Sequence, residues 1–504
     1  MATEDKPNII FILTDQQRYD TIAALGFDHM ITPNMDRLVH KGVSFHHAFC
    51  PGATCTPSRA AIFTGNYAHN TGVYSFNSWS HHRSWVQDLA DNGYHCVNIG
   101  KMHVIPTYDD LGFHERVVVE NPQNQLLQVD KRDDDWGRYL SLHQQTRPLD
   151  QQATDPDWLD KFQGVPWHLE EHLHSDVFIG NSATAWIRSN AIRKPLFLQI
   201  GFTGPHEVYD PLPRHYELYK DREVPLPIFK EGELAGKPPQ HLAHQDYFSR
   251  ANGDARVDLR SATREDMEHM RRHYYAKITT VDEKLGEILD ALEQNGYLDN
   301  ALVIFASDHG DMLGDHRLPY KWLMYEPVVR VPLIVWDTRL ESSDKSGPSG
   351  QSDALVSLID VGPTILEAAG IPVPAYLDGS SFLDIIRKDR SAAHRSCVIC
   401  EDNYLTMIRN ERYKMVYYTE QENDGELYDL HEDPDEVNNL FRDNRYEEVK
   451  RSLQLELLHI VLRSNYTNST YKNHDPEDQW LRPQDSAYLH YITKKNPTGW
   501  FNRQ

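Results

Sequence analysis

Cysteine and long apolar runs are scarce in this chain, and each scarcity argues against a class of protein. The 504 residues include only Cys50, Cys55, Cys96, Cys397 and Cys400, an odd and sparse set that argues against a disulfide framework. No apolar stretch is long enough to cross a membrane. No basic segment precedes the first apolar run, so we expect neither a secretory signal nor a lipid anchor. These features predict a cytoplasmic protein without membrane partners.

Basic residues are also in the minority. The chain has 51 Lys and Arg against 75 Asp and Glu, for a formal net charge of −24, which disfavours nucleic acid as a partner. An anionic substrate would therefore need cations that converge locally. The C-x-x-C pair of Cys397 and Cys400 has no second pair to complete a zinc site. The apolar residues between them suit a strand, so we interpret both as structural cysteines.

Short apolar strands alternate with helical patterns as far as residue 370. We predict strands at 7–15, 94–100, 194–202, 300–308 and 330–336, and helices at 32–42, 84–93, 175–190, 264–296 and 358–370. Such alternation predicts an α/β fold with a large, mostly parallel sheet sandwiched by helices. In these sheets the ligand site lies beyond the carboxyl ends of the strands.

Two long stretches interrupt this alternation, and a different pattern follows it. Residues 105–170 and 207–262 are too long to be ordinary connections; insertions that shape a substrate pocket and surface decoration are equal alternatives. Residues 404–419 and 426–440 predict an antiparallel hairpin leading to a turn and a helix. We therefore expect a large α/β domain over 1–370 and a smaller subdomain with an antiparallel sheet and a tail over 371–504. The tail is a candidate for forming a homo-oligomer.

Polar pairs follow two of the predicted strands. Asp15-Gln16 follows the first, and Asp308-His309 follows the strand at 300–308. Carboxylate and amide oxygens are hard ligands that suit calcium, magnesium or manganese, and the imidazole leans toward manganese or another transition ion. A single Asp at a strand end would be interpreted as a helix cap, but two such pairs in one sheet favour a divalent metal.

Cations gather at the same predicted edge of the sheet. They are Arg59, Lys101, His103, His206 and Lys321. Each alone is typical of a solvated surface, whereas their convergence would form an anion pocket despite the negative net charge.

Cys55 lies in the segment "TCTPSRAAIFTG", where Pro57 suits the first turn of a helix. Cys55 would then lie at the positive end of that helix, which lowers the pKa of a thiol. A buried structural cysteine, a thiolate nucleophile and a modified residue remain open. A thiolate is a soft ligand that matches a hard-metal site poorly, so an oxygen-bearing side chain at position 55 would remove the conflict.

The motif "CTPSR" at 55–59 matches the C-x-P-S-R signature of the type I sulfatases of the alkaline phosphatase superfamily. The chain resembles this family over roughly residues 7–370, through the ordered landmarks "PNIIFILTDQQ", "TPNMDRL", "CTPSRAAIFTG", "GKMH", "GPHEVYDP" and "SDHGDMLGDH", and "ELYDLHEDPDEVNNL" resembles its carboxyl-terminal signature. The resemblance implies an alkaline phosphatase-like fold and hydrolysis of aryl, alkyl or sugar sulfate esters. It also implies that a modifying enzyme acting on residues 55–59 converts Cys55 to formylglycine.

The resemblance further implies a role for each candidate residue. Asp15, Gln16, Asp308, His309 and the modified Cys55 would hold the metal, with calcium expected first and manganese or magnesium as alternatives. Arg59 would hold the modified residue, and His103 would bond it. Lys101 and Lys321 would bind sulfate oxygens. His206 would meet the leaving-group oxygen and, together with Lys321, protonate it. Asn77 would touch the substrate. Many family members have Asp-Asp and Asp-Asn where this chain has Asp15-Gln16 and Asp308-His309, which leaves the identity of the metal open.

Two other functions compete with this interpretation. Phosphonate monoester or phosphodiester hydrolases of the same superfamily use the same nucleophile and metal, and they resemble this chain around Asp15-Gln16 and Asp308-His309. They usually read C-x-P-A-R, however, and lack the Lys and His of "GKMH". Ser58, Lys101 and His103 therefore favour a sulfatase. A non-catalytic binding protein on this scaffold would have lost the cysteine or a metal ligand, and none is missing.

Overall fold

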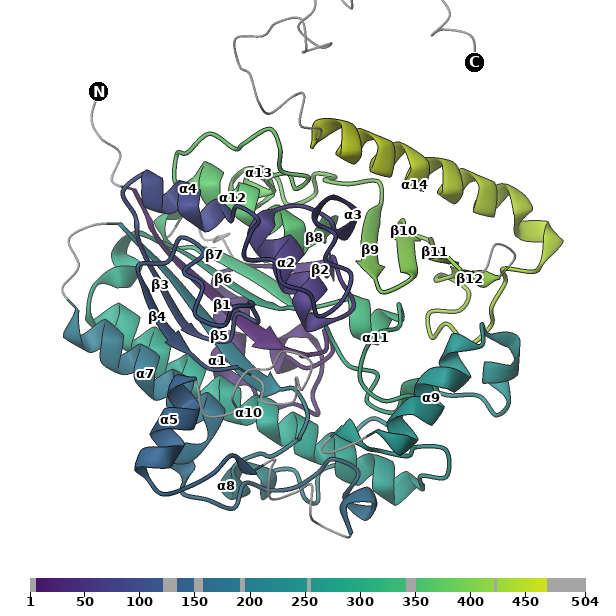
Figure 1. The fold of residues 1–504 in the computed structure, drawn as a ribbon, viewed down its shortest axis with the longest axis horizontal. Helices are drawn as coiled ribbons and strands as arrows, with labels where there is room; N and C mark the ends of the chain where they lie inside the picture. Colours follow the sequence, from purple (N-terminus) through teal and green to yellow (C-terminus); the bar gives the residue numbers. More distant parts are fainter. Residues whose placement is uncertain are drawn as a thin grey trace, which may run out of the picture.

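An eight-stranded sheet forms the centre of the molecule. The computed structural model describes residues 6–120, 134–148, 157–190, 195–251, 255–340, 350–420 and 424–468 (Figure 1). The sheet has the order β4-β3-β5-β1-β6-β7-β2-β8. Its strands are β1 (Asn8–Asp15), β2 (Val43–Phe49), β3 (His95–Gly100), β4 (Glu115–Val118), β5 (Leu196–Pro205), β6 (Ala301–Ser307), β7 (Leu333–Asp337) and β8 (Gly350–Ser357).

Strand direction confirms the predicted fold class, with one reversal. β1 lies at the middle of the sheet and pairs in parallel with β5 and β6. The strand predicted at 330–336 is β7, which runs antiparallel to both β6 and β2. The sequence did not predict β2, β4 or β8. β4 has only four residues. Polar residues obscure the apolar pattern of the other two, around His46 and His47 in the middle of β2 and in the first half of β8.

Helices cover both faces of this sheet. One face packs against α2 (Cys55–Thr64), α4 (Trp85–Asp91) and α12 (Val361–Ala368). The other packs against α1 (Pro33–Lys41), α7 (Ser175–Ser189) and the long α10 (Arg264–Gln294). Ile9, Phe11 and Leu13 of β1 belong to the first core, whereas Ile10 and Ile12 belong to the second. This alternation explains why β1 is a continuous apolar run.

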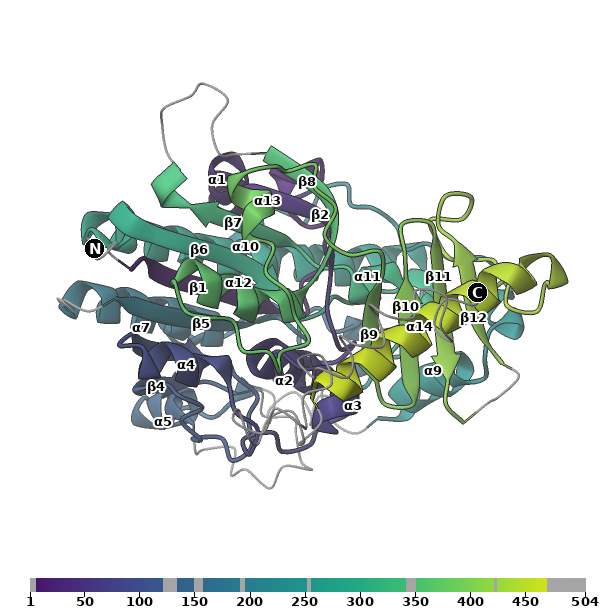
Figure 2. The ribbon, with the colours of Figure 1, turned by 90° about the horizontal axis from the view of Figure 1, so that it is seen from above.

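A second sheet of four antiparallel strands follows in the chain, as predicted. It has the order β12-β11-β10-β9, with β9 (Val398–Asp402), β10 (Leu405–Arg409), β11 (Tyr413–Tyr418) and β12 (Gly425–Asp429). The helix α14 (Glu447–Thr467) crosses this sheet (Figure 2). Cys397 directly precedes β9 and Cys400 lies in it; both are free and buried, in agreement with structural cysteines.

The predicted helix within 426–440 is wrong. After β12 the chain forms turns, and the next long helix begins only at Glu447. The carboxylate of Asp433 accepts hydrogen bonds from the backbone N–H groups of Val437 (3.2 Å) and Asn438 (2.7 Å). Glu436 has a φ of 56°. An Asp side chain that binds nearby backbone N–H groups competes with the helical hydrogen bonds.

Buried charges join the second sheet to the main body. Lys414 of β11 contacts Glu326 of α11 (Glu326–Val329) at 3.1 Å and also pairs with Glu436. Arg409 of β10 contacts Glu326 at 3.2 Å. Burial raises the pKa of Glu326, but Arg409 and Lys414 outweigh it and hold that pKa at about 2. A charged Glu326 therefore stabilises this junction.

The remaining helices are short and lie around the two sheets. They are α3 (Ala68–Thr71), α5 (Asp135–Leu142), α8 (Pro213–Tyr216), α9 (Gln240–Arg250) and α13 (Leu383–Arg387). Within the described ranges, no helix combines the length and apolar character needed to span a membrane.

Candidate active site

Three buried side chains meet where β1 and β6 end. Asp15 is the last residue of β1, and Asp308 and His309 follow β6, its parallel neighbour. Each offers one ligand atom, and these atoms lie within 4.8 Å of one another. The edge of the sheet thus brings together three of the five predicted metal ligands. Gln16 is turned elsewhere, and Cys55 does not belong to this group, so its place as a metal ligand stays a prediction.

Two atoms of this cluster lack partners. Asp15 Oδ1 and His309 Nε2 are buried without a hydrogen bond in the described part of the chain. His309 Nδ1 donates to the carbonyl of Gly310 at 2.9 Å, so Nε2 is the ring nitrogen left to bind a metal. That nitrogen lies 3.7 Å from Asp15 Oδ1 and 3.8 Å from Asp308 Oδ1. Buried acceptors facing one another are costly unless a cation satisfies them, so the donor set fits a divalent metal.

Asp308 is fixed by hydrogen bonds to both oxygens. Its Oδ1 accepts from the backbone N–H groups of Gln16 (3.0 Å) and His309 (2.9 Å). Its Oδ2 accepts from Arg59 Nε at 2.7 Å. The carboxylate therefore has one orientation, with Oδ1 toward His309.

Cys55 opens helix α2 beside this cluster. It is the first residue of a helix whose ten residues are all buried. Ser58 Oγ, one turn along, donates to the carbonyl of Asp308 at 2.6 Å, which ties the start of α2 to the end of β6. The sequence prediction of Cys55 at a helix N-terminus is confirmed.

Arg59, Lys101 and Lys321 converge on the cluster. Lys101 pairs with Asp15 Oδ2, and Arg59 Nη2 lies 3.7 Å from the same oxygen. Burial raises the pKa of Asp15, but the charges of Lys101 and Arg59 outweigh it and hold that pKa well below its ordinary value. Burial lowers the pKa of Lys321, but Glu207, Cys55 and Asp15 raise it above its ordinary value. Lys321 is therefore charged. Arg59, Lys101 and Lys321 together place cationic side chains at the site of a chain whose net charge is −24.

Both candidate histidines are neutral. His206 donates through Nδ1 to the carbonyl of Glu207 at 2.7 Å, and its backbone N–H donates to Asp15 O at 3.1 Å. Burial, and to a smaller extent the positive charge of Lys321, hold the pKa of His206 well below its ordinary value. Burial, with Lys101, lowers the pKa of His103 to about 3. Neither imidazole bears a second proton near neutral pH.

Gln16 faces two carboxylates that the sequence analysis did not single out. Its Nε2 donates to Glu207 Oε2 at 2.8 Å and to Asp311 Oδ2 at 2.6 Å, while its Oε1 accepts from Lys321. Tyr209 also donates to Asp311, at 2.7 Å. Glu207 lies in the motif "GPHEVYDP" and Asp311 in "SDHGDMLGDH". Their closeness in sequence to the candidates His206 and Asp308 could have identified them as residues of the site.

The segment 207–262 borders the site. His244 of α9 donates through Nε2 to the carbonyl of Lys321 at 2.8 Å. The adjacent Trp322 packs on Phe248 of the same helix, with ring centroids 5.1 Å apart. Lys321 lies between Tyr320 and Trp322, whose φ angles of 58° and 78° are unusual for aromatic residues. α9 therefore supports a strained turn that carries a candidate substrate ligand.

Two further segments contact residues that border the site. Glu120 from the segment 105–170 accepts the backbone N–H of His103 at 2.7 Å; much of that segment lies outside the described residues. Glu401 of β9 donates its backbone N–H to Pro51 O at 2.9 Å. The next residue, Asp402, is 2% exposed, and burial raises its pKa to about 7. The second sheet thus abuts the chain that leads into α2.

Asn77 is not brought to the cluster. It is exposed, and its side chain forms no hydrogen bond with the described residues. Its neighbour Phe76 packs against the His103 ring at 5.8 Å. The role of Asn77 in substrate binding stays a prediction.

Comparisons with known proteins agree with this arrangement. A family model described as "Sulfatase" matches residues 7–371. A second model, described as "N-sulphoglucosamine sulphohydrolase, C-terminal", matches residues 314–463. The first model contains every residue of the cluster described above, and the second contains the four-stranded sheet.

Individual relatives extend over most of the chain. An arylsulfatase of Clostridium perfringens is 30% identical over 460 residues, which cover 88% of this chain and 92% of the relative. An N-acetylglucosamine-6-O-sulfatase of Bacteroides thetaiotaomicron is 26% identical over 540 residues, which cover 94% of this chain and 88% of the relative. The solved structure of a phosphonate monoester hydrolase of Agrobacterium radiobacter superimposes with a TM-score of 0.75 at 23% identity. The superposition covers 91% of this chain and 96% of that one. At that identity the likeness concerns the fold.

Proposed function

Because the chain belongs to the sulfatase family and is a sulfuric ester hydrolase, we propose that it cleaves small aryl, alkyl or sugar sulfate esters with a formylglycine made from Cys55 and one divalent metal. The observation that carries the proposal is the pair of unpartnered buried atoms, Asp15 Oδ1 and His309 Nε2, beside the first residue of α2.

The metal would be held by Asp15, Asp308 and His309, with Gln16 as the weakest member of the set. The amide oxygen of Gln16 accepts from Lys321, whereas the other three present ligand atoms to a common point. Calcium is the first choice because two carboxylates dominate, and the imidazole keeps manganese and magnesium as alternatives.

When present, the metal supplies Lewis-acid charge and the formylglycine supplies a hydroxyl nucleophile. Lys101 and Lys321 would bind the sulfate oxygens and stabilise the charge that grows on them. Arg59 would orient the position-55 side chain, because its guanidinium is fixed by Asp308 and by the carbonyl of Lys101 at 2.9 Å. Each of these roles uses a charge that the site already buries.

Lys321 is the better candidate for protonating the leaving group. Burial lowers its pKa, but the neighbouring carboxylates, Glu207 first, raise it, so its ammonium group holds a proton. His206 is neutral, and its Nδ1 proton is engaged by a backbone carbonyl. His206 would instead orient the leaving-group oxygen next to Lys321.

The test compares metal-loaded protein with its Cys55→Ala variant on an aryl sulfate. We expect turnover in the wild type, none in the variant, and a peptide mass that shows an aldehyde at position 55. Cys397→Ala is the matched control, since this free cysteine lies beside β9 and should leave turnover unchanged. An intact thiol at position 55 in fully active protein would refute the formylglycine proposal. A screen of sulfated sugars, aryl sulfates and alkyl sulfates would then identify the substrate.

Phosphonate monoester hydrolysis is the second candidate. It is favoured by the pairs Asp15-Gln16 and Asp308-His309, in which this chain departs from the usual sulfatase pattern toward that sister group. Faster turnover of a phenyl phosphonate ester than of the matched aryl sulfate would reverse the ranking. The two-domain division at residue 370, the homo-oligomer and the cytoplasmic location stay predictions.

A further inference from the structure

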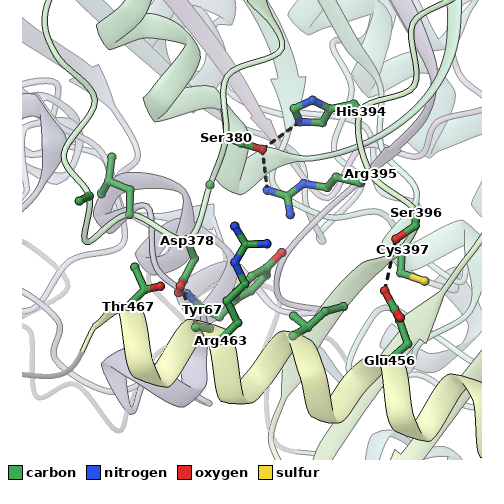
Figure 3. Close-up of a pocket in the computed structure, with 15 residues that line it drawn as sticks. Tyr67, Asp378, Ser380, His394, Arg395, Ser396, Cys397, Glu456, Arg463 and Thr467 are labelled. Atoms are coloured by element: carbon green, nitrogen blue, oxygen red, sulfur yellow. Dashed lines mark hydrogen bonds between the residues drawn. The ribbon is translucent and has the colours of Figure 1, made fainter. Parts of the chain in front are cut away.

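A cavity of about 560 Å³ lies between α14 and the loop that precedes β9 (Figure 3). Its volume is typical of small-molecule sites, which span roughly 300–1,000 Å³. Tyr67 lines it just beyond the C-terminal end of α2, whereas Cys55 opens the same ten-residue helix. An α-helix of that length spans about 15 Å, so the cavity is distinct from the candidate active site.

Two arginines line this cavity with unused donors. Arg463 extends from α14 toward the segments before and after α13 that carry Ser380 and Arg395 (Figure 3). It forms no hydrogen bond or ion pair with any described residue. Arg395 pairs through Nε with Asp360 at 2.8 Å and through Nη2 with the same carboxylate. Its Nη1 has no partner in the described ranges. Two guanidinium groups therefore offer free N–H donors to one space.

The carboxylate of Asp378, which also lines the cavity, is already occupied by other donors. Asp378 already accepts four hydrogen bonds, from Tyr67 N (3.1 Å), Asn70 Nδ2 (2.8 Å), Ser464 Oγ (2.6 Å) and Asn468 Nδ2 (3.0 Å). Its lone pairs are occupied by neutral donors. The guanidinium of Arg463 is left for an anion from outside the chain.

Glu456 marks the other end of the cavity. One of its oxygens accepts from Ser396 Oγ at 3.3 Å, and the other has no partner among the described residues. Glu456 and Arg463 are seven residues apart on α14, which corresponds to about 10 Å along the axis. Leu377 and Ile460 give the lining an apolar part. The lining thus suits a molecule with an oxyanion at one end and a hydrogen-bond donor at the other.

We propose that this cavity is a second ligand site, which binds a small organic oxyanion that also carries a hydroxyl or amino group. The oxyanion contacts Arg463 and Arg395, and the hydroxyl or amino group donates to Glu456. The inference does not depend on the chemistry proposed for Cys55, because no residue of that cluster lines the cavity.

The experiment measures binding by calorimetry at constant ionic strength, in a Cys55→Ala background that prevents turnover. One arm uses inorganic sulfate and the other uses glucose 6-sulfate. Arg463→Gln should weaken the binding of both probes about tenfold or more, the usual effect of removing a charge-assisted contact. Arg451→Gln, on the same helix but paired with Glu448 at 3.7 Å and outside the lining, is the matched control and should change neither.

Glu456→Gln separates the two ends of the site. It should weaken the binding of glucose 6-sulfate severalfold and leave inorganic sulfate unchanged. Equal affinities of the parent and Arg463→Gln for both probes would overturn the proposal. Equal weakening by Arg463→Gln and Arg451→Gln would also overturn it, because the effect would then be that of net charge alone.

Discussion

Replacing Lys414 by methionine tests whether buried charges hold the second sheet to the main body. Lys414 is completely buried and contacts Glu326 and Glu436. Its loss leaves Glu436 without its cation and Glu326 with Arg409 as its remaining close partner. Arg409 and Lys414 together hold the pKa of Glu326 at about 2 against an ordinary 4.5. At about 1.4 kcal/mol per pH unit the whole shift is on the order of 3 kcal/mol, of which Lys414 supplies a part. Breaking a buried ion pair costs a similar amount, about 3–5 kcal/mol.

The expected loss is measurable by differential scanning calorimetry. For a chain of 504 residues, an unfolding entropy of about 2.1 cal/mol/K per residue makes 3 kcal/mol equivalent to ~3 °C in Tm. Lys388→Met is the control, because Lys388 pairs with Asp384 at 2.8 Å but both side chains are more than two-thirds exposed (71% and 67%). We expect no resolvable change in Tm there.

The pH dependence supplies an independent check. The folded-state pKa of Glu326 is depressed, so its contribution is present above pH 4.5 and is lost as pH falls toward about 2. As the pH falls from 4.5 toward about 2, the free energy of unfolding should therefore decrease less in Lys414→Met than in the wild type. A Tm within about 1 °C of wild type at pH 7, or one that rises, would refute the reasoning.

Three further predictions concern the candidate site. Arg59→Lys should lower kcat/KM for a sulfate ester on the order of 100-fold, because an ammonium group cannot make both contacts, to Asp308 and to the carbonyl of Lys101; steady-state kinetics showing less than a fivefold loss would contradict this. His244→Leu should raise KM about tenfold with a smaller effect on kcat, since Lys321 loses the support of its carbonyl; an unchanged KM in a folded variant would argue against that support. Exhaustive chelation should abolish turnover and lower Tm, and calcium, manganese or magnesium should restore both. Full activity after chelation, with metal analysis showing none bound, would remove the metal from the proposal.

Sequence patterns located the site better than they located the sheet. Asp15, Asp308 and His309 were predictable because parallel neighbours end at one edge, and β1 and β6 are strongly apolar. β2 and β8 were missed because polar residues interrupt their apolar pattern. The reversal of β7 has no local signature, since strand direction depends on the connections that flank it.

The partners of residues that act through long-range contacts could not be predicted from the sequence. Gln16 carries a hydrogen-bonding side chain, but which groups it faces depends on Glu207 and Asp311, almost 200 and 300 positions away. His244 was one of several histidines in an insertion, and only the fold places it on Lys321. The false helix after β12 has a local cause that could have been recognised: Asp433 precedes acidic and amide residues typical of a turn.

The burial of α2 sets an order of events in the life of the chain. Cys55, Ser58 and Arg59 are at most 1% exposed, so an enzyme that must grip residues 55–59 has no access to them once the protein has folded. The groups that enclose this segment arrive late in synthesis, because Asp308 and Glu401 lie far downstream. At about 5–20 residues per second, synthesis from residue 59 to β9 takes on the order of half a minute. The proposed modification at Cys55 would therefore compete with folding, and conditions that speed folding relative to modification would yield a stable protein with an inert thiol.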